Sequence, residues 1–157
     1  MELQTRKPNR LKNYDYSQNG AYFITICTKD RKQILSQVIV GEDTILPSIK
    51  LLEYGIIIDK SINEIPLHYD DVFVDNYVIM PNHIHLIIRI NNNGRMVSAP
   101  TIIAGMKRYV SKQIGKSIWQ KSFYDHIIRD DIDYQQIWQY IDENPTKWAE
   151  DKYNTNI

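Results

Sequence analysis

Two histidines, His83 and His85, stand two positions apart in the run NHIHLIIRI. Because side chains alternate across a strand, both imidazoles project to one face of a strand predicted over residues 83–90. The other face is entirely apolar, so it must be the one that helices cover: Ile84, Leu86, Ile88 and Ile90. Imidazole is the commonest protein ligand for divalent transition metals, so the pair predicts a metal site on the open face of the sheet. Paired surface histidines are also common without a metal, and a site needs a third ligand.

A helix predicted over residues 134–143 supplies a candidate for that ligand. Tyr140 and Asn144 are four residues apart, so a phenol and a carboxamide oxygen lie on one flank of the helix, one turn apart. The helix would bury a stripe of Tyr134, Ile137, Trp138 and Ile141. The chain has eleven tyrosines, most of which must be packing residues, and Asn144 before Pro145 also fits an ordinary helix end.

The elements that must position these residues alternate between strands and helices. The pattern predicts a strand over residues 22–28, a hairpin of 38–40 and 44–46, a helix that Ser48 caps and Pro66 ends, strands over 71–80 and 83–90, a helix over 102–114, a strand over 122–129 and the final helix. This order is typical of an α+β, ferredoxin-like (RRM-like) βαββαβ fold. Such a fold has one antiparallel sheet with helices on one face, and it leaves a C-terminal helix that carries Tyr140.

Length and composition favour one compact domain. The 157 residues are 43% hydrophobic and 24% charged, which predicts a single domain with a basic arm (1–20), a ferredoxin-like core (21–130) and a C-terminal helix and tail (131–157). No apolar run approaches the roughly 20 residues of a membrane helix, and no secretory signal is recognisable, so we expect no membrane partner and a cytoplasmic location. The one cysteine, Cys27, cannot form an internal disulfide and is expected to be a buried structural thiol.

The formal net charge is zero, but the charges are segregated along the chain. Basic residues outnumber acidic ones by seven to three in residues 1–33 and by six to one in 107–129, whereas acidic residues dominate in 41–75 and 130–151. This pattern is compatible with a basic face for DNA phosphates, although a solvated surface has the same composition. The basic residues that we expect to contact phosphates, if this face binds a nucleic acid, are Arg6, Lys7, Arg10, Lys12, Lys107, Arg108, Lys112, Lys121 and Arg129. Asp130, Asp131 and Asp133 are expected next to the site, where they would weaken nonspecific affinity for nucleic acid and so favour a selective binder.

Four segments resemble the motifs of a known family, in the right order. Residues 77–86, YVIMPNHIHL, resemble the HUH motif of single-tyrosine transposases, in which two histidines flank a hydrophobic residue. Residues 118–129, IWQKSFYDHIIR, and 140–148, YIDENPTKW, are similar to downstream signatures of the REP-associated tyrosine transposase branch, and residues 22–28, YFITICT, to its first strand. The resemblance therefore covers nearly the whole chain, from about residue 13 to 148.

The resemblance implies a role for each of the candidate residues. His83 and His85 would be metal ligands, Asn144 the third ligand and Tyr140 the nucleophile. The ion would be Mg²⁺ or Mn²⁺. The substrate would be single-stranded DNA, often folded as a hairpin from a repetitive extragenic palindrome. Attack by the tyrosine would leave a 5′-phosphotyrosine link and a free 3′-hydroxyl, so that the strand can be rejoined.

Several alternatives stay open at the level of sequence. Tyr124 is a rival nucleophile, although no amide ligand accompanies it, and His126 is expected to be structural. Trp119 and Phe123 either pack in the core or stack on bases. The protein could be a catalytically silent, domesticated hairpin-binding module, a related HUH replication or relaxase nickase, or a metal-bound structural protein. A monomer and a homodimer are equally compatible with the sequence.

Overall fold

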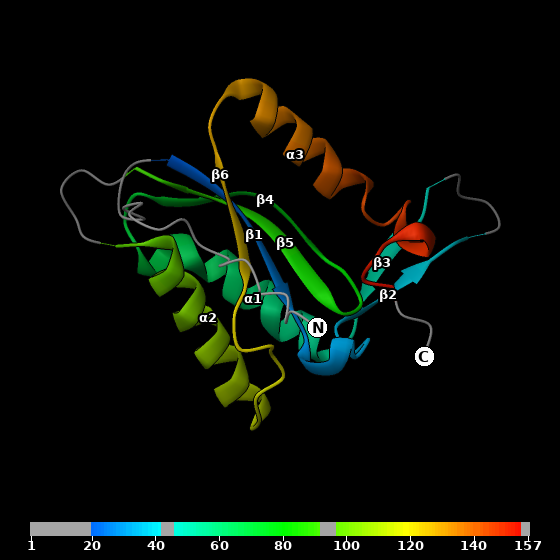
Figure 1. Ribbon diagram of the computed structural model, residues 1–157. Helices are drawn as coiled ribbons and strands as arrows, with labels where there is room; N and C mark the ends of the chain where they lie inside the picture. The colour runs from blue at the N-terminus through cyan, green and yellow to red at the C-terminus, as the bar shows by residue number, and fades with distance from the viewer. Residues whose placement is uncertain (1–19, 42–45, 92–96, 155–157) are drawn as a thin grey trace, which may run out of the picture.

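A computed structural model of the chain describes residues 20–41, 46–91 and 97–154, and its centre is a four-stranded antiparallel sheet. The strand order is β4-β5-β1-β6, with bounds β1 Gly20–Cys27, β4 Val72–Ile79, β5 His83–Ile90 and β6 Tyr124–Ile128. Helices α1 (Glu53–His68) and α2 (Ala99–Ile114) cover one face, and α3 (Asp131–Glu143) lies across the other (Figure 1). The predicted α+β fold, with its ferredoxin-like strand order, is confirmed.

The side-chain alternation of β5 divides the interior into two layers. The apolar set predicted for the covered face is buried in the core beneath α1 and α2: Ile84, Leu86, Ile88 and Ile90. On the other face, Phe23, Ile87 and Ile141 form a smaller apolar cluster under α3. This cluster fixes α3 against the face of the sheet that holds the two histidines.

The segment before α1 differs from the prediction. Ser48–Leu51 is strand β3, which pairs with β2 (Ser36–Ile39) in a separate two-stranded sheet, and α1 starts only at Glu53. Exposure alternates along β3, so its apolar residues Ile49 and Leu51 follow the period of two of a strand. Ser48 therefore does not cap the helix. The predicted second strand of the hairpin, 44–46, is not the partner of β2, and its residues 44 and 45 lie outside the described residues. Pro66 lies within α1, which ends two residues later at His68.

Local capping groups set the ends of the two later helices. Ser98 caps α2 by accepting a hydrogen bond from the Thr101 amide at 3.3 Å, and Gly115 ends it with a φ of 90° that L side chains rarely adopt. Asp130 caps α3 in the same way through the Asp133 amide at 2.8 Å. Within the described part of the chain, no helix is both long and apolar enough to cross a bilayer.

Candidate active site

The histidine pair lies at the start of β5, beside the end of β1. His83 is opposite Cys27 and His85 opposite Thr25 in the antiparallel register, and the two imidazole centroids are 4.6 Å apart. Both rings project to the predicted face, but they are buried, with exposed fractions of 0% and 1%. The prediction of an open face is wrong here, because the Tyr153 ring lies tilted against the His83 ring and the edge of Tyr140 contacts the His85 ring, with centroid distances of 4.3 and 5.2 Å.

Hydrogen bonds at the Nδ1 atoms orient both rings. His83 Nδ1 is 2.9 Å from Oδ1 of Asn82, an oxygen that only accepts, so Nδ1 carries the proton and donates it. His85 Nδ1 is 2.7 Å from the Thr25 hydroxyl. In metal sites such partners fix the tautomer and leave the Nε2 lone pair free for the ion.

Asn144 lies next to these rings at the end of α3. Its Nδ2 donates to the carbonyl of Tyr140 at 2.7 Å, which orients the amide, and its side chain is buried. His83 Nε2, His85 Nε2 and Asn144 Oδ1 are buried and have no hydrogen-bond partner among the described residues. Three unsatisfied lone-pair donors at one place fit a divalent cation. In the same part of the chain, no three His, Cys, Asp or Glu side chains form such a group by themselves.

Burial keeps both imidazoles neutral. It lowers the pKa of His83 to about 3, although the neighbouring Asn144 amide opposes part of this shift. Burial, together with the charge of His83, lowers the pKa of His85 well below its usual value. Both rings can therefore offer a lone pair at neutral pH without first losing a proton.

Tyr140 lies one helical turn before Asn144, with its phenol ring 39% exposed. Its ring contacts His85 and, at 6.0 Å, Phe23. Burial raises the pKa of Tyr140, as does the charge of Asp151, so the phenol is protonated at neutral pH. The nearby amide of Asn144 and the charge of Lys147 act in the opposite direction.

Tyr140 lines a pocket of about 430 Å³ on the sheet face. Its walls also include Tyr124, the rival nucleophile, which is 50% exposed. Tyr124 is opposite Thr25 in the register, so Thr25 separates it from His85, whereas Tyr140 is in contact with the His85 ring. The geometry therefore favours Tyr140 as the group nearest the histidines.

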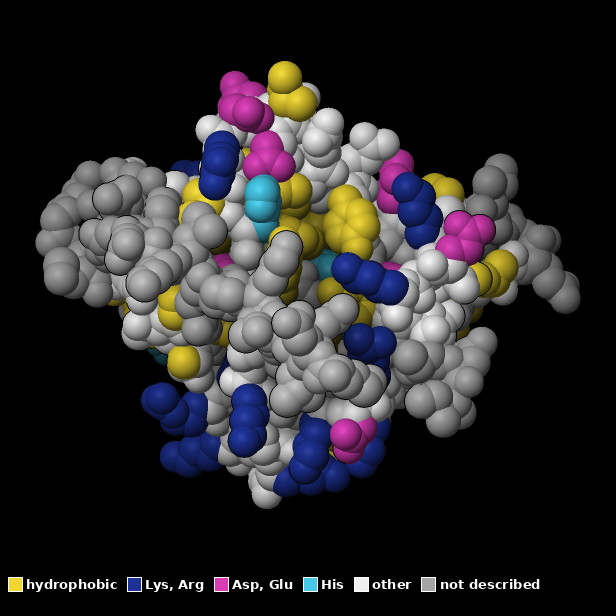
Figure 2. Space-filling model, viewed as in Figure 1, with side chains coloured by type: hydrophobic (Ala, Val, Ile, Leu, Met, Phe, Trp, Pro, Cys, Tyr) yellow, Lys and Arg dark blue, Asp and Glu magenta, His cyan; other side chains and the backbone are white. Residues whose placement is uncertain are grey.

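The predicted basic contacts are dispersed over the molecule. The arm residues Arg6, Lys7, Arg10 and Lys12 lie outside the described part of the chain. Arg108 and Lys112 are exposed on α2, on the face opposite the histidines, and Figure 2 shows Lys and Arg side chains gathered in the lower part of that view. Lys107 and Lys121 line a second pocket, which shares Ser122 and Phe123 with the first.

Arg129 and the acidic residues are at the other end of α3. Asp130 caps this helix, and Asp133 accepts a hydrogen bond from Nε2 of His126 at 2.8 Å, which gives His126 a structural role. Tyr140 is ten residues further along, about 15 Å at the helical rise. The prediction that residues 130–133 lie next to the site is therefore wrong.

Several pocket residues were not among the predicted site residues. Arg31, Lys152 and Tyr153 line the pocket with Tyr140. Cys27 is also part of the pocket wall and is only partly buried, which corrects the prediction of a buried thiol, although burial still raises its pKa. Trp119 and Phe123 pack in the core, and Phe123 also reaches the pocket. The only signal in the sequence for Arg31 was the excess of basic residues in 1–33.

Comparison with known proteins adds a family context to this site. No protein-family model matches the chain. An uncharacterized protein of Haemophilus influenzae is 31% identical over 174 aligned positions, which cover 96% of this chain and 93% of that protein. The chain belongs to the same family as this protein. A second Haemophilus influenzae protein, named "putative REP-associated tyrosine transposase", is 28% identical over 87% of this chain and 77% of its own length.

A solved structure has the same fold. It is a REP-associated tyrosine transposase bound to a REP hairpin, with a TM-score of 0.68 and 23% sequence identity over 91% of this chain and 76% of that chain. The chain is therefore similar to REP-associated tyrosine transposases in sequence and in fold. The resemblance seen in its motifs thus extends to overall sequence and to fold, which supports a transposase-like function.

Proposed function

We propose that the protein cleaves and rejoins single-stranded or hairpin DNA through a covalent bond to Tyr140. The observation that carries the proposal is the convergence of three unsatisfied lone-pair donors, on His83, His85 and Asn144, next to the partly exposed Tyr140, whose ring contacts His85. A buried imidazole pair without a metal would leave these atoms unpaired, which costs stability. The relatives described above support a reaction on DNA for this arrangement.

His83, His85 and Asn144 would hold Mg²⁺ or Mn²⁺ through two nitrogens and one oxygen. Such an ion polarises a phosphate and offsets the negative charge that develops on it. The chain itself prepares this site in advance. Asn82 and Thr25 hold the two Nδ1 atoms, and the Tyr140 carbonyl holds the Asn144 amide, so that the donors need not reorganise when the ion binds.

The Tyr140 oxygen would attack the phosphorus of one phosphodiester. A bond forms between this oxygen and phosphorus, and the bond from phosphorus to the 3′-oxygen of the preceding nucleotide breaks. The phenol loses its proton and the departing 3′-oxygen gains one, so that the products are a 5′-phosphotyrosine and a free 3′-hydroxyl. Attack by a 3′-hydroxyl on this link reverses the step and rejoins a strand, with no net hydrolysis.

The walls of the pocket are compatible with a single DNA strand. Aromatic rings from three elements offer surfaces on which bases can stack, and the basic side chains can bind phosphates: Phe23, Tyr124, Tyr140, Arg31 and Lys152. A base paired in a duplex has no free face for such contacts. The REP hairpin in the related transposase supports a hairpin with single-stranded flanks as the substrate of this protein.

The proposal is tested with hairpin oligonucleotides that carry single-stranded flanks and a 3′-end label, in Mg²⁺ or Mn²⁺. The wild-type protein should form a labelled species that survives denaturing electrophoresis, because the 3′ fragment stays on the tyrosine. Tyr140→Phe should abolish this species and still bind the hairpin, since it loses one oxygen and keeps the packing ring. Tyr124→Phe is the matched control and should retain it.

The other outcomes distinguish the alternatives. Hairpin binding without any covalent species would indicate a catalytically silent binding module. No affinity for hairpin DNA, together with tight metal binding, would indicate a structural metal protein. An adduct that forms on unstructured single strands as readily as on hairpins would favour a nickase of the replication or relaxase type.

A further inference from the structure

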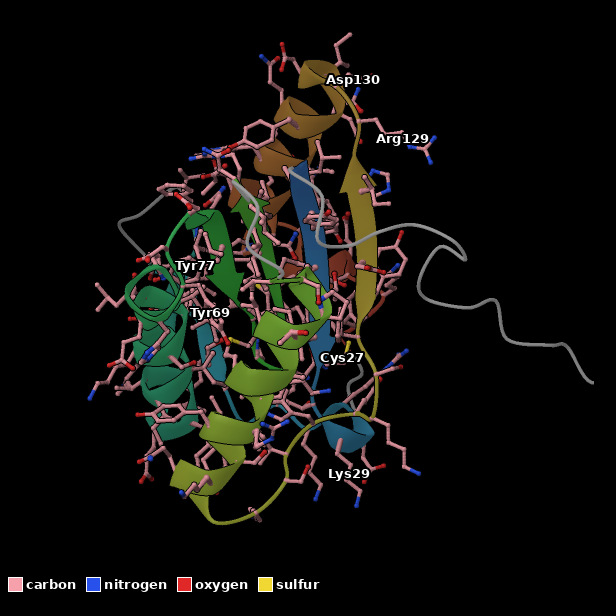
Figure 3. All side chains as sticks on the ribbon, turned by 90° about the vertical axis from the view of Figure 1, so that its left-hand side faces the viewer. Cys27, Lys29, Tyr69, Tyr77, Arg129 and Asp130 are labelled. Atoms are coloured by element: carbon pink, nitrogen blue, oxygen red, sulfur yellow. The ribbon has the colours of Figure 1, made fainter. Side chains whose placement is uncertain are left out.

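A left-handed turn follows β1 at the edge of the pocket. Asp30 and Arg31 have φ values of 56° and 53°, in the region that non-glycine residues rarely adopt. Such a conformation is strained and persists only where its surroundings impose it. Figure 3 shows where the turn begins, with Cys27 at the end of β1 and Lys29 just beyond it. Two consecutive residues in this conformation must therefore be held by contacts with the rest of the protein.

Buried side chains hold this turn in place. Thr28 Oγ1 donates to the Lys32 carbonyl at 2.9 Å, and the Arg31 amide donates to the Thr28 carbonyl at 3.2 Å. Asn82 Nδ2 donates to the Arg31 carbonyl at 3.2 Å. Asn82 is the residue whose Oδ1 accepts the proton of His83 Nδ1, so one side chain sets the position of both the turn and the ring. The backbone of Arg31 is thus tied directly to the histidine pair.

The turn places the side chain of Arg31 at the pocket that Tyr140 and His85 also line. Its Cζ lies 5.7 Å from the centroid of the Tyr153 ring, and Nη1 is 3.5 Å from the Lys152 carbonyl. Among the described residues, no carboxylate is paired with this guanidinium. A guanidinium with free donors matches two oxygens of a phosphate at once.

We infer that Arg31 binds the phosphate that Tyr140 attacks. The guanidinium would hold non-bridging oxygens of this phosphate from the 29–31 turn, in the same pocket that Tyr140 lines. The strained backbone then has a function, because it holds a cation beside the reacting group before the DNA binds. This inference rests on the function proposed above for Tyr140.

The matched control for Arg31 is on the same turn. Lys29 is exposed and carries the same charge, but it does not line the pocket. Arg31→Gln and Lys29→Gln therefore remove one positive charge each from the same three-residue segment. Glutamine, unlike glycine or asparagine, adopts a positive φ about as rarely as arginine does. Arg31→Gln therefore leaves the backbone strain of the turn unchanged. Arg31→Lys keeps the charge and loses the planar fork.

Binding is measured in a Tyr140→Phe background, so that the strand stays intact. The probe is a fluorescent hairpin oligonucleotide with single-stranded flanks, titrated at several KCl concentrations, with each backbone phosphate replaced in turn by an uncharged methylphosphonate. Arg31→Gln should weaken binding about tenfold and reduce the salt slope by about 0.7. Lys29→Gln should change the affinity less than twofold, and Arg31→Lys should keep the slope while it weakens binding.

The methylphosphonate scan identifies the phosphate that Arg31 contacts. At one position the Arg31→Gln penalty should disappear, because the partner charge is already gone, and that phosphate should be the one joined to tyrosine in the wild-type adduct. The inference is overturned if Arg31→Gln behaves like Lys29→Gln, if the penalty persists at every position, or if it disappears at another phosphate. Absence of a covalent adduct refutes both the proposed function and the assignment of a scissile phosphate. If the adduct forms but the effects of Arg31→Gln and of each methylphosphonate simply add, only the role of Arg31 is refuted.

Discussion

Acid should destabilise the protein through its buried histidines. The pKa of His83 is about 3 in the folded protein, against 6.5 for a histidine that water surrounds, as in the unfolded chain. Above pH 6.5 the ring is neutral in both states, so pH has no effect through this group. Between pH 6.5 and 3 the unfolded chain binds a proton that the folded protein does not, so stability falls as the pH is lowered.

The size of this effect follows from the two pKa values. At pH 4 the unfolded ring is protonated and the folded ring is still neutral, which corresponds to a loss of about 3 kcal/mol. The loss approaches about 5 kcal/mol below pH 3, where the folded ring also begins to bind a proton. Water does not screen this effect on stability, because the exposed fraction of His83 is 0%. The lowered pKa of His85 adds a loss in the same direction.

Urea unfolding at pH 7 and pH 4, in a chelator, measures this loss. Wild-type protein should lose about 3 kcal/mol more between the two pH values than His83→Gln, whose side chain does not titrate. His68→Gln is the control, since His68 is exposed near the end of α1, and it should follow the wild type. Equal losses in wild type and His83→Gln would refute the reasoning, because a ring buried in its neutral form must oppose protonation.

Five further substitutions, including two matched controls, test the metal ligands and the packing of α3. Thr25→Val removes the hydroxyl partner of His85 and should weaken Mn²⁺ binding about 10–100-fold by calorimetry, and unchanged affinity would contradict the assigned role. Asn144→Ala should also weaken Mn²⁺ binding, whereas Asn144→Asp should keep it, because a carboxylate oxygen can replace the amide oxygen; equal affinity of the two variants would exclude Asn144 as a ligand. Ile141→Ala should lower the free energy of unfolding by about 2–5 kcal/mol, against at most about 0.5 kcal/mol for Ile132→Ala on the exposed face of the same helix. Similar losses in the two variants would mean that α3 is not packed on the sheet as described.

The sheet and the histidine pair were predictable because their signals are local. A period of two in residues 83–90 decides which side chains enter the core, and β5 follows it. The four-residue spacing of Tyr140 and Asn144 likewise holds in any regular helix, and the structure keeps both side chains beside the histidines.

The start of α1 was not predictable from the same rules. Residues 48–52 contain apolar side chains at positions that suit either a strand or a helix, and pairing with β2 decides between them. Such pairing depends on residues about a dozen positions away, which local periodicity does not report.

Local sequence patterns also could not predict that the two histidines are buried. Tyr153 covers His83 from a position 70 residues away. Arg31 reaches the pocket through a turn in which its own φ is 53°, a conformation that arginine rarely adopts. Asn82 connects these parts by hydrogen bonds to the carbonyls of Arg31 and Tyr153. Contacts of this kind arise only in the folded protein.

The position of the covalent bond to DNA tests the central claim most directly. Wild-type protein is incubated with a hairpin oligonucleotide and Mn²⁺, digested with nuclease and protease, and its peptides are analysed by mass spectrometry. The account predicts a nucleotide attached through its 5′-phosphate to Tyr140, at the end of α3. A nucleotide on Tyr124 or any other residue, or one attached through its 3′-phosphate, would contradict it.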